Sequence, residues 1–184
     1  MSFKKAGLVV LLVTAVVSLA YIIGVEGAQY YSKSQKYQKK KLLTEQILEK
    51  SNLEINGQLP DFSFEDLSFN EVKLSTLISD NSIIFFISPD CHSCLEDIEH
   101  LQKTITDDNI WNRFIFISSG NPRKLIDLYN EDNRLQILYD HEGFYYQMVG
   151  IETYPTHVLI DAQMRIKNLI PGPLSDTDYK KFLN

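Results

Sequence analysis

Residues 83–94, IIFFISPDCHSC, join a short apolar run to a pair of cysteines. The run at 83–87 is rich in β-branched and aromatic residues, which is typical of a buried central strand. Ser88-Pro89-Asp90 ends that pattern. Apolar residues then recur at the spacing of a helix: Cys94, Leu95, Ile98, Leu101 and Ile105. The stretch predicts a buried strand that passes into an amphipathic helix, with the cysteines at the junction.

Cys91 and Cys94 are the only cysteines of the 184 residues. Two randomly placed cysteines would have this spacing in roughly one chain in a hundred, so the pair is interpreted as one device. A redox disulfide and a metal site are the two chemical uses of such a pair, and the third alternative is no function.

The predicted junction favours redox chemistry. Unpaired backbone N–H groups and the positive end of the helix dipole stabilise a thiolate at Cys91 and lower its pKa. Residues i and i+3 share a helix face, so Cys94 can close a disulfide with Cys91. Cys91 is therefore the predicted attacking sulfur and Cys94 the resolving sulfur.

Three further segments carry a family resemblance: GQLPDFSF at 57–64, VKLSTL at 72–77 and TYPTHVLID at 153–161. With the cysteine pair, they make the chain resemble the thioredoxin-like fold from about Gly57 to the C-terminus. More narrowly, it resembles the membrane-anchored TlpA/ResA-like thiol-disulfide oxidoreductases. The resemblance implies an α/β sandwich, a central mixed sheet flanked by helices, with 57–64 as its opening strand.

The resemblance also implies a substrate contact at Pro155. In thioredoxin-like proteins this proline is cis and faces the cysteine pair. It turns neighbouring backbone outward, where an extended substrate segment can pair with it. Tyr154, Pro155 and Thr156 are the substrate-binding residues so implied.

Residues around the cysteines are expected to tune the redox couple. Asp90 stands where the family usually has an aromatic residue, and its carboxylate disfavours a thiolate at Cys91. His92, when protonated, acts in the opposite direction. Ser93 stands where oxidising relatives often have histidine. The direction of electron flow stays open.

In relatives, two positions can carry the group that takes the proton from the second cysteine. Phe85 occupies the strand position where relatives often bury an acid or amide, so that helper is missing. Asp97 matches an acidic position of TlpA/ResA-like proteins and could accept the proton of Cys94. The alternative, given equal weight, is that Asp97 is a solvated carboxylate on the helix surface. His157 could approach the cysteines, although a strand histidine usually packs or meets solvent.

The N-terminal region predicts a membrane anchor. Residues 6–25 carry no charge, and a helix of that length spans the roughly 30 Å hydrocarbon core. A cleaved signal peptide is the alternative, but the apolar stretch continues past the small residues at 18–20. Lys4 and Lys5 precede the stretch and five lysines at 33–41 follow it, which alone favours a cytoplasmic domain. From the family resemblance we expect a single-pass protein with its domain on the extracytoplasmic face.

The expected organisation is a flank at 1–5, the anchor at 6–25, a polar helix or tether at 26–52 and one domain at 53–184. The formal charge is +5 for residues 1–50 and −11 for 51–184. Such an acidic domain excludes nucleic acid as a partner, because phosphate binding needs a basic surface.

Pattern and turn residues predict the remaining elements. Strands are expected at 114–118, 136–139 and 165–169, a helix from Pro122 to Tyr129, and a short aromatic helix or turn at 144–149. Ser175 and Asp178 match a capping box for a terminal helix.

The predicted function is thiol-disulfide exchange with protein dithiol or disulfide substrates and an upstream redox partner, of the disulfide-reduction or cytochrome c maturation type. We expect no cofactor beyond the Cys91–Cys94 disulfide, and no metal. Zinc would need a second ligand pair, and the peroxiredoxin pattern P-x-x-x-T-x-x-C is not matched. Copper delivery, with His157 beside the thiolates, and a non-catalytic docking module are the alternatives.

Overall fold

The computed structural model describes residues 53–120, 134–175 and 177–179, with Lys124 and scattered positions between 21 and 49. The chain divides into two compact units, Met1–Lys41 and Leu42–Asn184. The described positions of the first unit are helical and exposed. Most of the predicted anchor and most of the predicted helix at 122–129 lie outside the described residues. No helix among the described residues is both long and apolar enough to cross a membrane.

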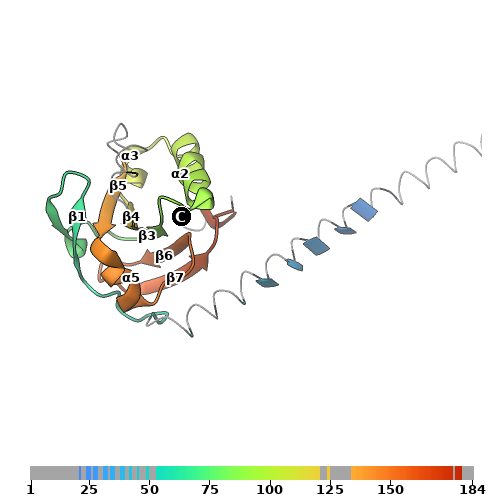
Figure 1. Ribbon diagram of the computed structural model, residues 1–184. Helices are drawn as coiled ribbons and strands as arrows, with labels where there is room; N and C mark the ends of the chain where they lie inside the picture. Colours follow the sequence, from blue (N-terminus) through green and yellow to red (C-terminus); the bar gives the residue numbers. More distant parts are fainter. Residues whose placement is uncertain are drawn as a thin grey trace, which may run out of the picture. The chain divides into compact units, whose positions relative to one another are not determined.

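The second unit alternates strands and helices along the chain (Figure 1). Its described elements are, in order, β1 (Ser63–Asp66), β2 (Glu71–Lys73), the 3-10 turn η1 (Leu74–Thr76), β3 (Ser82–Ile87), α2 (His92–Thr104), α3 (Asp108–Trp111), β4 (Phe114–Ser119), β5 (Gln136–Asp140), the 3-10 turn η2 (His141–Gly143), α5 (Phe144–Val149), β6 (Thr156–Ile160) and β7 (Ile166–Pro171).

The described strands form one mixed sheet in the order β2-β1-β5-β4-β3-β6-β7. β3 pairs in parallel with β4 and antiparallel with β6, so it is an interior strand of the sheet. Its six residues are all buried, as a strand covered on both faces requires. The mixed sheet that the resemblance implies is confirmed.

The alternation of side chains along β3 divides the core into two layers. Ile83 and Phe85 pack in the layer that contains Cys94 and Leu101 of α2. Phe86 packs in the other layer, with the tyrosines of α5. Figure 1 shows α2 and α5 beside the sheet that they cover. One face of β3 therefore packs against α2, the helix that begins at the cysteine motif.

Asp140 fixes the start of α5 at the end of β5. Its buried carboxylate accepts from the backbone N–H of Tyr145 at 3.0 Å and of Tyr146 at 2.9 Å.

The Tyr146 hydroxyl donates toward the carbonyl oxygens of Ile87 (2.8 Å) and Ile117 (2.5 Å). The Tyr146 side chain therefore links the end of β3, which leads into the cysteines, to the end of the neighbouring strand β4.

Most predicted element positions are confirmed, and two boundaries differ. The strands expected at 114–118 and 136–139, the aromatic helix at 144–149 and the Ser175–Asp178 capping box are present. The last strand begins at Ile166 and runs to Pro171. The expected opening strand at 57–64 is wrong for its first part: β1 begins at Ser63, the bonds of 57–62 to 164–166 are isolated, and Pro60 has no N–H to donate to a strand pair.

Candidate redox site

Cys91 and Cys94 lie where β3 passes into α2, as predicted. Cys91 is the N-cap of α2, with extended backbone, and its sulfur accepts from the N–H of Cys94 at 3.2 Å. The two residues form a disulfide, and their Cα atoms are 5.3 Å apart. The same N–H and the helix dipole are available to stabilise a thiolate on Cys91 after reduction.

Solvent access differs sharply between the two sulfur-bearing residues. Cys91 is half-buried, whereas Cys94 is completely buried against Phe85 and the apolar face of α2. A partner sulfur must reach the one it attacks, so only Cys91 is open to an incoming thiol. This difference in burial is what the expected order of attack and resolution requires, and that order stays a prediction.

The three neighbouring residues predicted to tune the couple lie toward solvent. Asp90 is exposed and forms an ion pair with Lys124. His92 is exposed, and its Nε2 lies 3.2 Å from Glu96 one turn along the helix. Ser93 is half-buried. Water and these counter-charges screen each group, so its effect on Cys91 is small compared with a buried charge.

Asp97 is buried, at 5% exposure, and the alternative of a solvated carboxylate is wrong. Both of its oxygens accept from the N–H of Leu174 at 3.2 Å, and the Tyr179 hydroxyl donates to Oδ1 at 3.2 Å. Helical periodicity placed Asp97 one turn after Cys94. The residues that cover it, Leu174 and Tyr179, come from the C-terminal end of the chain. The periodicity of the helix therefore could not predict this burial.

His157 of β6 is also buried and lies close to Asp97. It is 0% exposed, and its Nε2 lies 3.2 Å from Asp97 Oδ2. Its ring packs edge-on against Phe85, with centroids 4.0 Å apart, because β3 and β6 place the two residues opposite each other. From the sequence, this histidine was expected to pack in the core or to face solvent, and its contact with Asp97 was not predicted. The available signal was its position two residues after Pro155.

The Tyr154–Pro155 peptide bond is cis, as the resemblance implies. Tyr154 is half-buried, whereas Pro155 and Thr156 are buried. The Thr156 hydroxyl donates to the carbonyl oxygen of Thr153 at 2.7 Å and is turned inward. Of the three implied substrate contacts, Tyr154 presents the most side chain to a partner.

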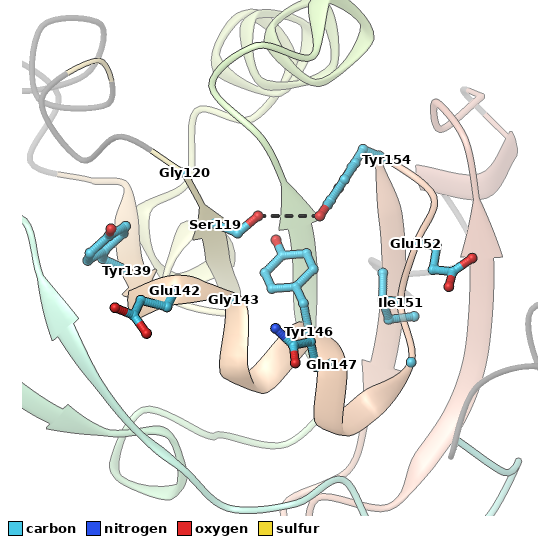
Figure 2. A pocket seen from close by; sticks show the side chains of 11 residues that line it. Ser119, Gly120, Tyr139, Glu142, Gly143, Tyr146, Gln147, Ile151, Glu152 and Tyr154 are labelled. Atoms are coloured by element: carbon cyan, nitrogen blue, oxygen red, sulfur yellow. Dashed lines mark hydrogen bonds between the residues drawn. The ribbon is translucent and has the colours of Figure 1, made fainter.

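A cavity of about 740 Å³ lies beside Tyr154 (Figure 2). In Figure 2 the hydroxyls of Tyr154 and Ser119 meet across it, 3.3 Å apart. Glu142 and Glu152 line the same cavity, and it also reaches Gly120. A Cβ on Gly120 would lie 3.4 Å from the ring of Pro89, so the cavity adjoins the loop that carries the cysteines.

No metal site is formed by the residues that the structure describes. Among them, no group of three or more histidine, cysteine, aspartate or glutamate side chains is arranged to hold an ion.

Several solved structures have a similar fold. A secreted Mycobacterium tuberculosis disulfide oxidoreductase described as homologous to E. coli DsbE is 14% identical, with a TM-score of 0.54, over 66% of this chain and 93% of that one. The thioredoxin domain of a Bacteroides vulgatus thiol-disulfide oxidoreductase is 18% identical (TM-score 0.54; 72% and 100% covered). The exposed lipoprotein thioredoxin Etrx1 of Streptococcus pneumoniae is 19% identical (TM-score 0.54; 67% and 98% covered).

The mixed sheet, the cysteine pair at the start of α2 and the cis-proline before β6 define a thioredoxin-like protein of the thiol-disulfide oxidoreductase class. The AhpC/TSA family matches residues 55–169, and the chain belongs to that family. The solved structures are consistent with the TlpA/ResA-like resemblance within it. No curated protein matches the sequence significantly.

Proposed function

We propose that this protein exchanges disulfides with partner proteins through Cys91 and Cys94. The unequal burial of the two cysteines carries the proposal, because it leaves one sulfur open to attack and keeps the other in reserve. A partner thiolate attacks Cys91, and the electron pair of the broken disulfide goes to Cys94. In the opposite direction, Cys94 attacks the mixed disulfide at Cys91 and releases the partner as a thiolate.

Trapping the mixed disulfide tests this function. Cys94→Ser leaves Cys91 able to react but removes the resolving sulfur, so Cys91-linked partners should accumulate on non-reducing gels. Cys91→Ser is the matched control, since it keeps one thiol at the buried position. Bands that depend on Cys91 are those that disappear in the double variant Cys91→Ser/Cys94→Ser. If Cys94→Ser yields no such bands, thiol exchange with proteins is refuted. The trapped proteins would also identify the substrate and the upstream redox partner.

We also propose that residues 6–25 anchor the protein and that the domain acts outside the cytoplasm. The uncharged stretch supports the anchor, and the TlpA/ResA-like resemblance supports the location. Alkaline carbonate should fail to extract the chain from membranes. A membrane-impermeant maleimide should label the reduced Cys94→Ser variant in intact cells, and labelling only after lysis would contradict the proposed side.

A role in disulfide reduction or in cytochrome c maturation fits this proposal. Equilibration of the full chain with reduced and oxidised glutathione would determine which form dominates at a given ratio. A couple more reducing than glutathione supports electron donation, and a more oxidising couple contradicts a reductive role.

A further inference from the structure

The cavity beside Tyr154 carries charge of one sign. Its volume of about 740 Å³ is that of a site able to hold a small molecule or a large side chain. Among the residues that the structure describes, its charged lining residues are Glu142 and Glu152, and both are exposed. In Figure 2 the two glutamates lie on either side of Tyr146. A group that enters the cavity therefore meets negative charge from two separate segments, η2 and the loop before β6.

These two carboxylates have no counter-charge, unlike the exposed carboxylates beside the cysteines. Asp90 and Glu96 are each paired with a basic side chain. The side chains of Glu142 and Glu152 make no hydrogen bond and no ion pair with any residue that the structure describes. A cation from another molecule can therefore pair with them without breaking a contact within this chain.

The walls of the cavity suit the stem of a long basic side chain. Buried Tyr146 and Ile151 line it, and so do half-buried Tyr139 and Tyr154 (Figure 2). Lysine and arginine lay their methylene groups along apolar surface and keep the charged head group near water. Tyrosine rings also attract a cation that lies over their face. Apolar walls with a negative rim thus match lysine or arginine, and they disfavour an acidic side chain.

The cavity adjoins the segments that carry the reactive cysteine and the cis-proline. Tyr154, which lines it, directly precedes Pro155. Tyr154 and Cys91 both pack against the same layer of the core. Tyr146, on another wall, donates its hydroxyl hydrogen to the carbonyl oxygen of Ile87 at 2.8 Å, where β3 ends before the cysteine loop. A polypeptide segment bonded to Cys91 therefore has this cavity beside it.

We propose that the cavity selects partner proteins in which a lysine or arginine lies close in sequence to the reactive cysteine, an inference that rests on the proposed thiol exchange. As the partner sulfur bonds to Cys91, its basic neighbour enters between Glu142 and Glu152. The contact adds no chemical step, because the bonds broken and formed are those of the exchange itself. It favours the encounter and the mixed disulfide, since a negative cavity attracts cationic segments and repels acidic ones. The two glutamates are specificity residues.

Opening of the disulfide by synthetic peptides tests the proposal in the full chain. Each peptide contains one cysteine and one variable residue, which is lysine, glutamine or glutamate and is moved through every position near the cysteine. Rate constants are taken per peptide thiolate and divided by those for oxidised glutathione, so that differences in thiol reactivity cancel. At the best position the lysine peptide should react about fivefold faster than the glutamine peptide, as expected for an exposed ion pair, and the glutamate peptide more slowly. Added salt should reduce the preference.

Matched variants separate the cavity from the net charge of the domain. Glu142→Gln/Glu152→Gln should bring the lysine-to-glutamine rate ratio to about one. Glu54→Gln/Glu99→Gln removes two exposed carboxylates that do not line the cavity, and it should keep the wild-type ratio. Glu142→Lys/Glu152→Lys should reverse the order, so that the glutamate peptide reacts fastest. Damage to the fold would instead slow all three peptides alike.

The results that would overturn the proposal differ from those that would overturn thiol exchange. Equal rates for the three peptides at every position refute selection by charge. A preference that survives Glu142→Gln/Glu152→Gln refutes the cavity as its source. In both cases the peptides still open the disulfide, so the proposed function stands. If no peptide opens it, thiol exchange is refuted and the proposed selection with it.

Discussion

Removing one hydroxyl, in Tyr146→Phe, tests how the end of β3 is held beneath the cysteine loop. The hydroxyl lies 2.8 Å from the Ile87 carbonyl oxygen and 2.5 Å from that of Ile117, and Tyr146 is 4% exposed. Phenylalanine preserves the ring and leaves these buried acceptors without their donor. Loss of a buried hydrogen bond costs about 1–3 kcal/mol of unfolding free energy. We expect a loss of that size at pH 7.

The same substitution should change the response to alkaline pH. Burial is the main cause that raises the pKa of Tyr146 well above its usual value of 10.0. Unfolded tyrosine ionises near pH 10 while the folded residue stays neutral, so the unfolded state holds fewer protons. Above pH 10 stability then falls with rising pH, by up to about 1.4 kcal/mol per unit for each such tyrosine. Tyr146→Phe should remove one such share.

Urea unfolding at pH 7 and at several values from 10 to 11 measures both effects. Cys91→Ser/Cys94→Ser serves as the background for all variants, so that disulfide chemistry does not intervene. Tyr145→Phe is the matched control: its hydroxyl donates to the Pro60 carbonyl oxygen at 2.8 Å, and burial likewise raises its pKa. It should remove an equal alkaline share. The reasoning fails if Tyr146→Phe costs less than about 0.3 kcal/mol at pH 7 and keeps the wild-type alkaline slope.

Two further predictions concern the core and acid stability. Leu101→Ala, at a completely buried position of α2, should lower the unfolding free energy by about 2–5 kcal/mol, and an unchanged urea midpoint would contradict the packing described. A hydrogen bond and ion pair from Lys167, followed by the N–H of Arg165, lower the pKa of Asp161 below 3.8. Its contribution is therefore present above pH 3.8 and lost as pH falls through the lower folded value; Asp161→Asn should be less stable at pH 7 and less sensitive to acid below pH 3.8, measured by thermal melts.

Local pattern was sufficient for the elements that carry the cysteines. A continuous apolar run, a break and a helical repeat predicted β3 and α2, and the spacing of Cys91 and Cys94 predicted their disulfide. These features depend on neighbours within one or two turns of the chain, so the sequence contains the interactions that produce them. The cis state of Pro155 was predictable only through the resemblance, because a single proline is trans by default.

The surroundings of Asp97 and His157 were decided by tertiary structure. Asp97 reads as an ordinary helix carboxylate until the C-terminal segment brings Leu174 and Tyr179 over it. His157 reads as an ordinary strand residue until β6 pairs with β3 and places its ring beside Phe85 and Asp97. Sequence alone therefore predicted which two cysteines form the disulfide and where they lie. Burial by chain-distant segments decided which of the two cysteines is accessible and which polar side chains are enclosed near Phe85, because solvent exclusion is a property of the whole packed domain.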